Sequence, residues 1–201
     1  KREGEDMSRD RSASVKRITK ETDIELSLSL DGSGRSSIDT GIGFLDHMLE
    51  LFAFHGSLDL EIKCRGDLEV DSHHTTEDIA IALGQAFREA LEDKKGIERY
   101  GQCYLPMDET LARIVLDFSG RSCCVFNAGF TRDTLGSLAT EDIREFFMAL
   151  SANAGLTLHA EVLYGSNDHH RAESLFKGLG RAVKSAISVT SDRILSTKGV
   201  I

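Results

Sequence analysis

Apolar and polar residues follow two different periods along the first half of the chain. In residues 24–30 and 58–64 they alternate, and this period of two predicts strands with one face in the core and one in water. After Gly43, apolar residues recur at spacings of three and four until Gly56, which predicts a helix packed on one side. The same spacing continues through residues 79–90 and predicts a longer helix.

The second half of the chain repeats this order. Its pattern predicts strands at residues 112–118, 122–127 and 156–163, and helices at residues 140–154 and 169–187. The letters repeat as well, because each half reaches a helix-ending glycine, a strand and then a His-His pair. We therefore predict an α+β fold made by tandem duplication of a two-layer α/β unit, with helices packed on one face of each sheet.

The repeats define the domain organisation. We predict a single domain over residues 15–201, with repeats of about 15–98 and 99–195. Residues 1–14 are charged and have little to bury, so they predict a disordered tail.

Composition restricts the classes of ligand. The chain has 201 residues, with 24 Lys and Arg against 33 Asp and Glu, and its net charge of −9 disfavours general binding to nucleic acids or anionic membranes. An anionic ligand must be held by a local cluster of cations. No apolar run approaches the length of a membrane span or a signal peptide, so we expect a soluble cytoplasmic protein, with an organelle left open. The four cysteines form no CxxC pair, which favours reduced, mostly buried thiols.

Histidines supply the most specific chemistry in the sequence. Two adjacent pairs are each followed by a glutamate three residues after the second histidine, and the residues are His73, His74 and Glu77, then His169, His170 and Glu173. Neighbouring helical residues point about 100° apart, whereas residues three or four apart share a face. Both histidines of a pair can therefore lie beside the same glutamate, and one pair can serve two metal ions.

The duplicated motif favours a metal site over chance. If the repeats face each other, the pairs supply mixed nitrogen and oxygen ligands, with His47 and its repeat equivalent Glu145 as further candidates. A single His-His pair would more often be a solvated helix start. Its repetition in the same context makes that interpretation much weaker.

Four motifs of the chain match one enzyme family in that family's order. They are Gly43-Phe44-Leu45-Asp46-His47-Met48, residues 73–78, residues 167–173 and residues 196–200. On these motifs, the chain from about Val15 to its end resembles imidazoleglycerol-phosphate dehydratase. The resemblance implies a hydro-lyase of histidine biosynthesis that converts D-erythro-imidazole-glycerol phosphate to imidazole-acetol phosphate.

The resemblance also implies a fold, a cofactor and an assembly. The fold is of the ribosomal-protein-S5 domain 2 type, the cofactor is Mn²⁺ with two ions per site, and the homo-oligomer has 24 subunits built from trimers, with sites between chains. Zn²⁺ or another divalent ion could replace Mn²⁺ in purified protein. The metal ligands that it implies are His47, His73, His74, Glu77, Glu145, His169, His170 and Glu173. Many relatives have histidine where this chain has Glu145, and either side chain can ligate.

Catalytic and substrate-binding residues are carried over from the same motifs. Glu21 and Glu173 are the predicted catalytic groups, although without the resemblance Glu21 would be an ordinary exposed glutamate at a strand start. The predicted substrate-binding residues are Glu21, His55, Arg99, Arg121, Lys177, Ser196, Thr197 and Lys198. Their cations are what a phosphate needs in an acidic chain. His55 also ends a predicted helix, where helix capping alone explains a cation.

Two other functions remain open. The His/Glu clusters could tie subunits together in a non-catalytic metal-binding assembly protein, or serve a metallohydrolase. The cations and Glu21 favour the lyase, because a structural metal node requires neither. The HExxH spacing of zincins is absent, which argues against a peptidase.

Overall fold

The computed structural model describes residues 11–201, and both halves of this range have the same order of elements. The first half consists of β1 (Ser12–Ile18), β2 (Thr22–Ser29), β3 (Ser36–Asp39), α1 (Gly43–Gly56), β4 (Asp59–Gly66) and α2 (His73–Leu91). The second half consists of β5 (Tyr100–Met107), β6 (Thr110–Asp117), β7 (Cys123–Asn127), the short pair β8 (Thr134–Leu135) and β9 (Leu138–Ala139), α3 (Thr140–Ala154), β10 (Thr157–Tyr164) and α4 (Asp168–Ala186).

The two four-stranded sheets have one topology. Their strand orders are β1-β2-β4-β3 and β5-β6-β10-β7. In each sheet the first three strands of this order are antiparallel and the last strand is parallel to its neighbour. This equivalence confirms the predicted α+β class and the tandem duplication.

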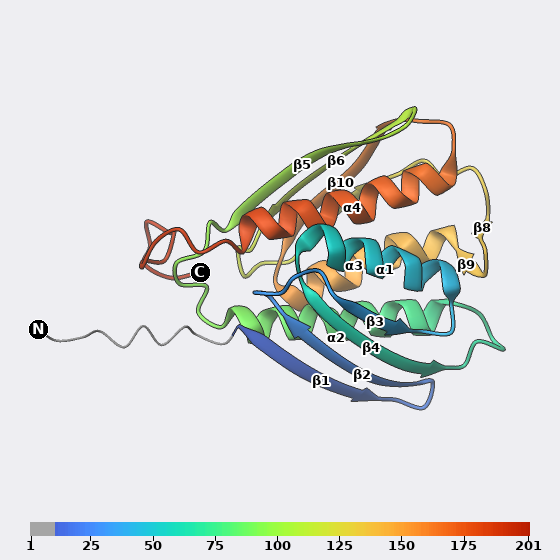
Figure 1. Ribbon diagram of the computed structural model, residues 1–201, viewed down its shortest axis with the longest axis horizontal. Coiled ribbons are helices and arrows are strands. Elements are labelled where there is room, and N and C mark those ends of the chain that lie inside the picture. The colour runs from blue at the N-terminus through green and yellow to red at the C-terminus, as the bar shows by residue number, and fades with distance from the viewer. Residues whose placement is uncertain (1–10) are drawn as a thin grey trace, which may run out of the picture.

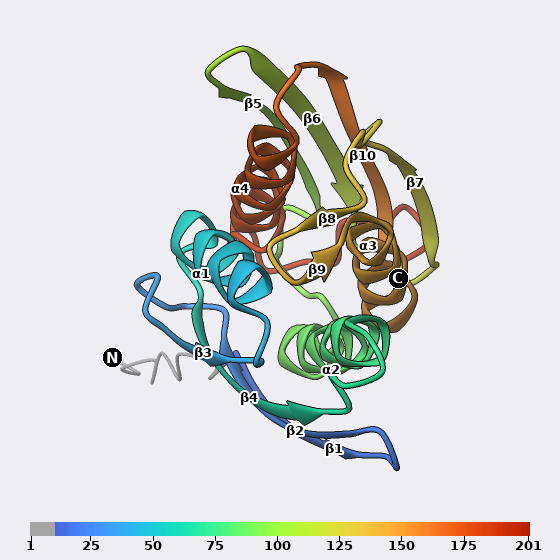
Figure 2. The same ribbon diagram turned by 90° about the vertical axis from the view of Figure 1, so that its right-hand side faces the viewer.

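All four helices lie between the two sheets, so each sheet has helices on one face only (Figures 1 and 2). Helix α1 packs on α4, and α2 packs on α3. The interior between the layers holds large aromatic side chains that are almost fully buried, namely Phe52, Phe87, Phe118, Phe146, Phe147 and Phe176.

Equivalent glycines allow the two helix pairs to approach closely. A Cβ on Gly180 of α4 would lie 2.5 Å from the Phe52 carbonyl oxygen of α1. A Cβ on Gly84 of α2 would lie 2.6 Å from Asn153 Cβ and 2.9 Å from the Ala154 nitrogen of α3. The duplication therefore extends to the contacts that set the helix positions.

The helices all begin at the same end of the molecule. In Figure 1 each of the four helices begins at the right, and the C-terminus of the chain lies at the left. Because the predicted metal ligands stand in the first turns of helices, this arrangement brings them to one end.

Five strands of the described chain escaped the prediction, namely the two-residue strands β8 and β9 and three strands of the main sheets, which were missed for local reasons. Strand β1 has only half-buried inward side chains, and β3 has a single apolar residue, Ile38. In β5 the alternation is hidden by exposed Tyr100 and Tyr104 and by Gly101, whose Cβ would lie 1.9 Å from the Ala182 carbonyl oxygen of α4.

Two further expectations need correction. The tail was predicted to cover residues 1–14, but β1 begins at Ser12 and pairs with β2, and residues 1–10 lie outside the described part. The cysteines are free, yet only Cys64 is buried, so the prediction of mostly buried thiols is wrong. Cys123 is exposed because it lies on the outward side of the last strand of its sheet.

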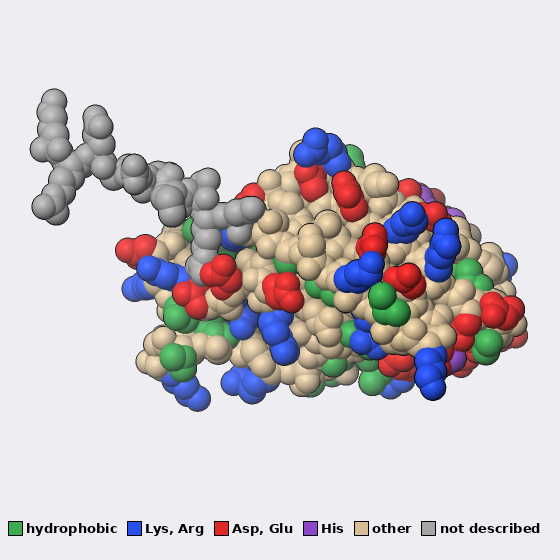
Figure 3. Space-filling view, turned by 90° about the horizontal axis from the view of Figure 1, so that it is seen from below, with side chains coloured by type: hydrophobic (Ala, Val, Ile, Leu, Met, Phe, Trp, Pro, Cys, Tyr) green, Lys and Arg blue, Asp and Glu red, His purple; other side chains and the backbone are tan. Residues whose placement is uncertain are grey.

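The outer side of the first sheet is charged. Glu25 and Lys63 are opposite one another across β2 and β4, and side chains of both signs are interspersed over this face (Figure 3). Within residues 11–201, no helix combines the length and the apolar character needed to cross a membrane.

Candidate functional site

Three predicted metal ligands meet where α1 packs on α4. His47 Nε2 lies 3.1 Å from Glu173 Oε1, and His169 Nε2 lies 3.0 Å from the same oxygen. One ligand atom from each residue falls within 4.8 Å of the other two. His169 and Glu173 share a face of α4 because they are four residues apart.

Hydrogen bonds from three neighbouring side chains keep the buried Glu173 carboxyl ionised. Its side chain is only 8% exposed, whereas those of His47 and His169 are 44% and 45% exposed. Burial alone would raise the pKa of Glu173, but hydrogen bonds from Lys177, His47 and His169 outweigh it and lower the pKa to about 2. The cluster therefore combines a carboxylate with two imidazole nitrogens that solvent can reach.

The equivalent residues of the first pair form a looser arrangement. His73 Nε2 lies 3.8 Å from Glu77 Oε2, and His73 Nδ1 lies 3.1 Å from Asp142 Oδ1 of α3. Glu145, the repeat equivalent of His47, accepts a hydrogen bond from Arg144. The structure thus brings His73 and Glu77 near each other, and within residues 11–201 Glu145 forms no hydrogen bond or ion pair with either of them.

His74 lies between two carboxylates. Its Nδ1 is 2.9 Å from Asp67 Oδ2, and its Nε2 is 3.9 Å from Glu21 Oε1 at the β1–β2 turn. The hydrogen bond to Asp67 raises the pKa of His74. The predicted catalytic residue Glu21 is therefore near a predicted metal ligand.

His170 has a similar environment at the β5–β6 turn. Its Nδ1 is 2.7 Å from Glu109 Oε2, and its Nε2 is 3.8 Å from Asp108 Oδ2. The Glu109 carboxylate raises the pKa of His170, and His170 in turn holds the pKa of Glu109 well below its usual range. Asn167 caps α4 by accepting hydrogen bonds from the His169 and His170 backbone, which explains why the helix begins here.

One chain does not unite the two histidine pairs. The cluster contains His169 from the second pair and neither member of the first. Across residues 11–201, no hydrogen bond or ion pair links the two pairs. The hypothesis that the repeats face each other to form one ligand set is therefore wrong for a single chain, because α2 packs on α3 and α4 packs on α1.

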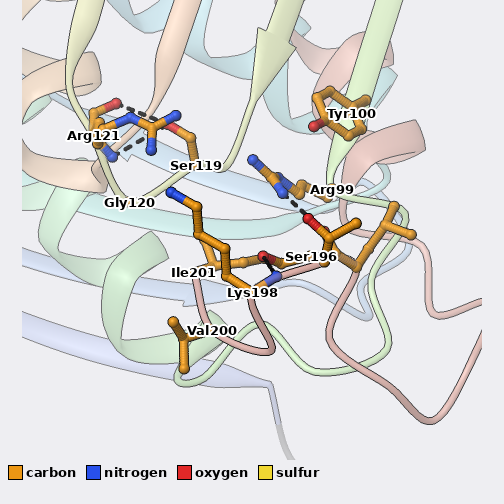
Figure 4. A pocket seen from close by; sticks show the side chains of 11 residues that line it. Arg99, Tyr100, Ser119, Gly120, Arg121, Ser196, Lys198, Val200 and Ile201 are labelled. Atoms are coloured by element: carbon orange, nitrogen blue, oxygen red, sulfur yellow. Dashed lines mark hydrogen bonds between the residues drawn. The ribbon is translucent and has the colours of Figure 1, made fainter.

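The predicted phosphate-binding residues line a separate cavity of about 760 Å³. Arg99, Arg121, Ser196, Thr197 and Lys198 all contribute to its wall. In Figure 4 the Lys198 side chain extends toward Arg121 across this cavity.

Arg99 joins this cavity to the sheet and to the C-terminal segment. Its guanidinium donates to the Asp117 carboxylate at 2.6 and 3.0 Å and to the Leu195 carbonyl at 2.8 Å. Its backbone N–H donates to the carbonyl of Ala186, the last residue of α4. The cavity therefore lies at the opposite end of α4 from the metal cluster.

Three predicted substrate-binding residues lie outside that cavity, and one of them is Glu21, which lies beside His74. Lys177 Nζ donates to Glu173 at 2.5 Å, so it belongs to the cluster. His55 lies in the last turn of α1 and is half-buried, and burial together with the charges of Lys177 and Arg181 lowers its pKa. Lys177 therefore contacts Glu173 and is not in the cavity where its predicted phosphate role would place it.

Sequence reasoning missed three carboxylates that hold histidines, namely Asp67, Glu109 and Asp142. Asp67 comes directly after the glycine that ends β4, and Glu109 lies in a two-residue turn, so a strand-end rule could have found both. Asp142 is buried in the first turn of α3, and its pattern resembles an ordinary helix start.

Comparisons with known proteins agree with these features. Residues 40–183 match the family model described as imidazoleglycerol-phosphate dehydratase. Proteins of that name from Methylorubrum extorquens and Lactiplantibacillus plantarum are 56% and 55% identical, over 94% and 95% of this chain and 98% and 100% of theirs. The crystal structure of the Staphylococcus aureus imidazoleglycerol-phosphate dehydratase has a TM-score of 0.81 at 44% identity, covering 89% of this chain and 99% of its own. The structure described as IGPD from Pyrococcus furiosus in complex with (S)-C348 has a TM-score of 0.80 at 36% identity, covering 93% and 100%. The chain therefore belongs to the imidazoleglycerol-phosphate dehydratase family, and it is a dehydratase, an enzyme that removes water from its substrate.

Proposed function

We propose that the chain dehydrates D-erythro-imidazole-glycerol phosphate to imidazole-acetol phosphate in histidine biosynthesis, with divalent metal ions, Mn²⁺ first among them, held by its histidines and glutamates. The family supports the type of reaction. The metal cluster and the cationic cavity match the two ends of this substrate, an imidazole ring and a phosphate. A cytoplasmic location, with an organelle left open, stays a prediction from the sequence.

The donor set of the cluster suits a divalent ion. His47 and His169 offer imidazole nitrogens and Glu173 offers a carboxylate oxygen, a mixed set that Mn²⁺, Fe²⁺ and Zn²⁺ all accept. The partial exposure of both imidazoles leaves the position between them open to solvent. When bound, such an ion supplies Lewis-acid charge and a position that can orient a substrate nitrogen.

The protein's own carboxylates differ in what they can do with a proton. With a pKa of about 2, Glu173 is ionised at neutral pH, so it can accept but not donate. Glu21 has half of its side chain exposed, and its Oε1 lies 3.9 Å from Nε2 of the predicted metal ligand His74. We therefore assign the movement of the substrate proton to Glu21 and a binding role to Glu173.

The phosphate end of the substrate fits the cavity at the other end of α4. Arg121 and Lys198 supply charge there, and Ser196 and Thr197 add hydroxyl groups. A guanidinium gives paired hydrogen bonds to phosphate oxygens, whereas a lysine gives a point charge. This local cluster offsets the unfavourable net charge of the chain.

The separation of cluster and cavity carries the proposal that sites form between chains. At about 1.5 Å per residue, Glu173 and Ala186 lie about 20 Å apart along α4. Five bonds join the imidazole ring to the phosphorus of the substrate, so at about 1.5 Å per bond its ends are less than about 8 Å apart. One molecule cannot reach both sites of one chain, so a second chain must supply one of them. The number of 24 subunits built from trimers rests on the family resemblance alone.

The first test measures turnover and its dependence on metal. Purified protein is stripped with a chelator, reloaded with Mn²⁺ and given the substrate, and formation of the ketone is followed. We expect activity only after reloading. If loaded protein gives no product while chelation dissociates the subunits, the metal holds an assembly together and the lyase proposal fails.

The second test asks whether one site uses two chains. Glu173→Gln and Lys198→Ala should each abolish turnover, and co-expression of the two variants at equal amounts should restore up to about a quarter of it, because some sites then receive both intact residues. Co-expression of Glu173→Gln with Glu173→Ala is the control and should restore nothing. Mixed oligomers that remain inactive would mean that each site uses one chain.

A further inference from the structure

Three of the four paired histidines face a carboxylate through the same ring nitrogen. The Nδ1–carboxylate pairs are His74 with Asp67 at 2.9 Å, His170 with Glu109 at 2.7 Å and His73 with Asp142 at 3.1 Å. The carboxylates come from three different places in the fold: the end of β4, the β5–β6 turn and the first turn of α3. One local motif therefore cannot account for the shared geometry.

A carboxylate at Nδ1 selects one form of the ring. An ionised carboxylate only accepts hydrogen bonds, so a neutral imidazole facing it carries its proton on Nδ1 and leaves the Nε2 lone pair free. The two imidazoles of the cluster, His47 and His169, also present Nε2 to its centre. We propose that the three carboxylates are positioning residues that fix their histidines as Nε2 metal ligands. This inference rests on the proposed metal-dependent function.

Glu109 is itself held in place through its other oxygen. Its Oε1 accepts hydrogen bonds from the backbone N–H groups of Ser166 and Asn167 at 3.0 and 2.8 Å, and from the Thr110 hydroxyl at 3.0 Å. Only Oε2 remains for His170. The β5–β6 turn is thereby tied to the loop that leads into α4.

Asp67 has the opposite arrangement. Its Oδ2 faces His74, while its Oδ1 is buried and has no hydrogen-bond partner among the described residues. Nothing therefore constrains which oxygen faces the ring. Asp142 is intermediate, because its second oxygen accepts the Ser72 hydroxyl, which in turn accepts the Ala139 N–H.

The fourth paired histidine, His169, has no carboxylate at its Nδ1 among the described residues, because a phenylalanine stands where a carboxylate would be. Phe44 holds the position in α1 that corresponds to Asp142 in α3, and its ring makes a T-shaped contact with the His169 ring, with the centroids 5.3 Å apart. His169 instead meets Glu173 through Nε2. An aromatic contact thus orients this ring where a carboxylate orients the equivalent His73.

The difference between Glu109 and Asp67 gives a discriminating test. In Glu109→Gln the amide oxygen stays with the two backbone N–H groups, so the NH₂ group faces His170 Nδ1 and donates to it. The proton of the ring then moves to Nε2, which can no longer bind a metal ion. In Asp67→Asn the amide oxygen is free to face His74, so the ring keeps its form.

The experiment measures Mn²⁺ binding and the histidine tautomers separately. Calorimetry should give at least about a tenfold loss of Mn²⁺ affinity at the affected site in Glu109→Gln, in the range found when a group holding a metal ligand is lost, and a much smaller change in Asp67→Asn. Solid-state ¹⁵N spectra of metal-free protein should show one histidine changing to the Nε2–H form in Glu109→Gln only. Asp71→Asn is the matched control for charge, because Asp71 contacts the backbone N–H of His73 and not its ring.

Each outcome separates the inference from the proposed function. Equal Mn²⁺ affinity in Glu109→Gln and the parent, or equal losses in Glu109→Gln and Asp67→Asn, would overturn the positioning role. A parent protein that binds no Mn²⁺ would overturn the proposed function, and the tautomer spectra would still decide whether the carboxylates select the ring form. Thermal unfolding of each variant checks that it is folded, and Asp142→Ala offers a second test at His73, where loss of the acceptor should populate both ring forms.

Discussion

Gly66 ends β4 against the first turn of α2, and Gly66→Ala should destabilise the protein through one atom. A Cβ at residue 66 would lie 1.9 Å from Thr75 Oγ1, 3.2 Å from Thr75 Cβ and 3.6 Å from Thr75 Cγ2. Carbon contacts are optimal at about 3.5–4.0 Å, so the hydroxyl oxygen causes nearly all of the overlap. Overpacking costs about 1–3 kcal/mol, and we expect the upper end because Thr75 is fully buried.

Thr75→Ala should rescue this variant. The Thr75 hydroxyl oxygen is buried without a hydrogen-bond partner, so its removal recovers about 1–3 kcal/mol of desolvation cost. This gain offsets the loss of the methyl group, which is worth about 0.8 kcal/mol. The double variant keeps only the 3.2 Å contact between the Cβ atoms, so we expect a coupling energy of about 2–3 kcal/mol between the two sites.

The second repeat supplies the control. Gly165 follows β10 as Gly66 ends β4, and its Cβ would lie 2.3 Å from Thr110 Oγ1. However, it would also lie 2.8 Å from Thr110 Cβ, and Gly165 has a φ of +154° that other residues rarely adopt. Thr110→Ala should therefore fail to rescue Gly165→Ala.

Urea unfolding followed by circular dichroism gives the four free energies of each cycle. All variants are measured at one protein concentration, because association adds to apparent stability. A Gly66→Ala protein as stable as its parent, or one that Thr75→Ala leaves equally unstable, would refute the reasoning from this contact.

Three further predictions concern stability. Asp78→Ala removes the acceptor of two hydrogen bonds from Arg17. Because 30% of the Arg17 side chain is exposed, the loss in unfolding free energy, measured in urea, should be about 2–3 kcal/mol, less than for a fully buried pair. A loss below about 1 kcal/mol would contradict this. The Arg35 guanidinium holds the pKa of Asp59 well below its usual range. The ionised Asp59 carboxylate therefore stabilises the fold above about pH 4, and this stabilisation is lost as the pH falls toward the folded pKa. The Tm of Asp59→Asn should fall less between about pH 6 and pH 3 than the Tm of the parent, and an equal fall would disprove this prediction. Gly155→Ala should lower the free energy of unfolding by about 1–2 kcal/mol, since Gly155 ends α3 at φ 65° and its Cβ would lie 3.2 Å from the Gly120 backbone; unchanged stability would rule out strain at this helix end.

Periodicity predicted those elements that have one fully buried face. Strand β2 and helix α3 were located within a few residues, because each alternation or helical spacing reports a buried face directly. The same reasoning could not find β1, whose inward side chains are only half buried, or β5, whose Gly101 gives no side chain to read. Both depend on contacts with a neighbouring element.

The sequence predicted which residue types make up the candidate site, but only part of how those residues lie relative to one another. His47, His169 and Glu173 do meet, since helical spacing places the last two on one face and α1 brings the first. Asp67 and Asp142 were missed because their partners are set by the end of one strand and by the packing of α3 on α2. Lys177 was assigned to the phosphate, but it lies four residues after Glu173 and pairs with it.

The sequence alone determined the duplication, the class of fold, the doubled His-His-x-x-Glu motif and the residues predicted to bind metal and phosphate. Those features are local, because hydrophobic spacing and motif letters depend only on neighbours along the chain. The tertiary structure decided that the two histidine pairs stay apart within one chain and that three of the four paired histidines face carboxylates of other segments. It also placed the cavity lined by the predicted phosphate-binding residues at the far end of α4. These depend on which helices cross and which strands are adjacent, and periodicity reports only that a face is buried, not what it is buried against.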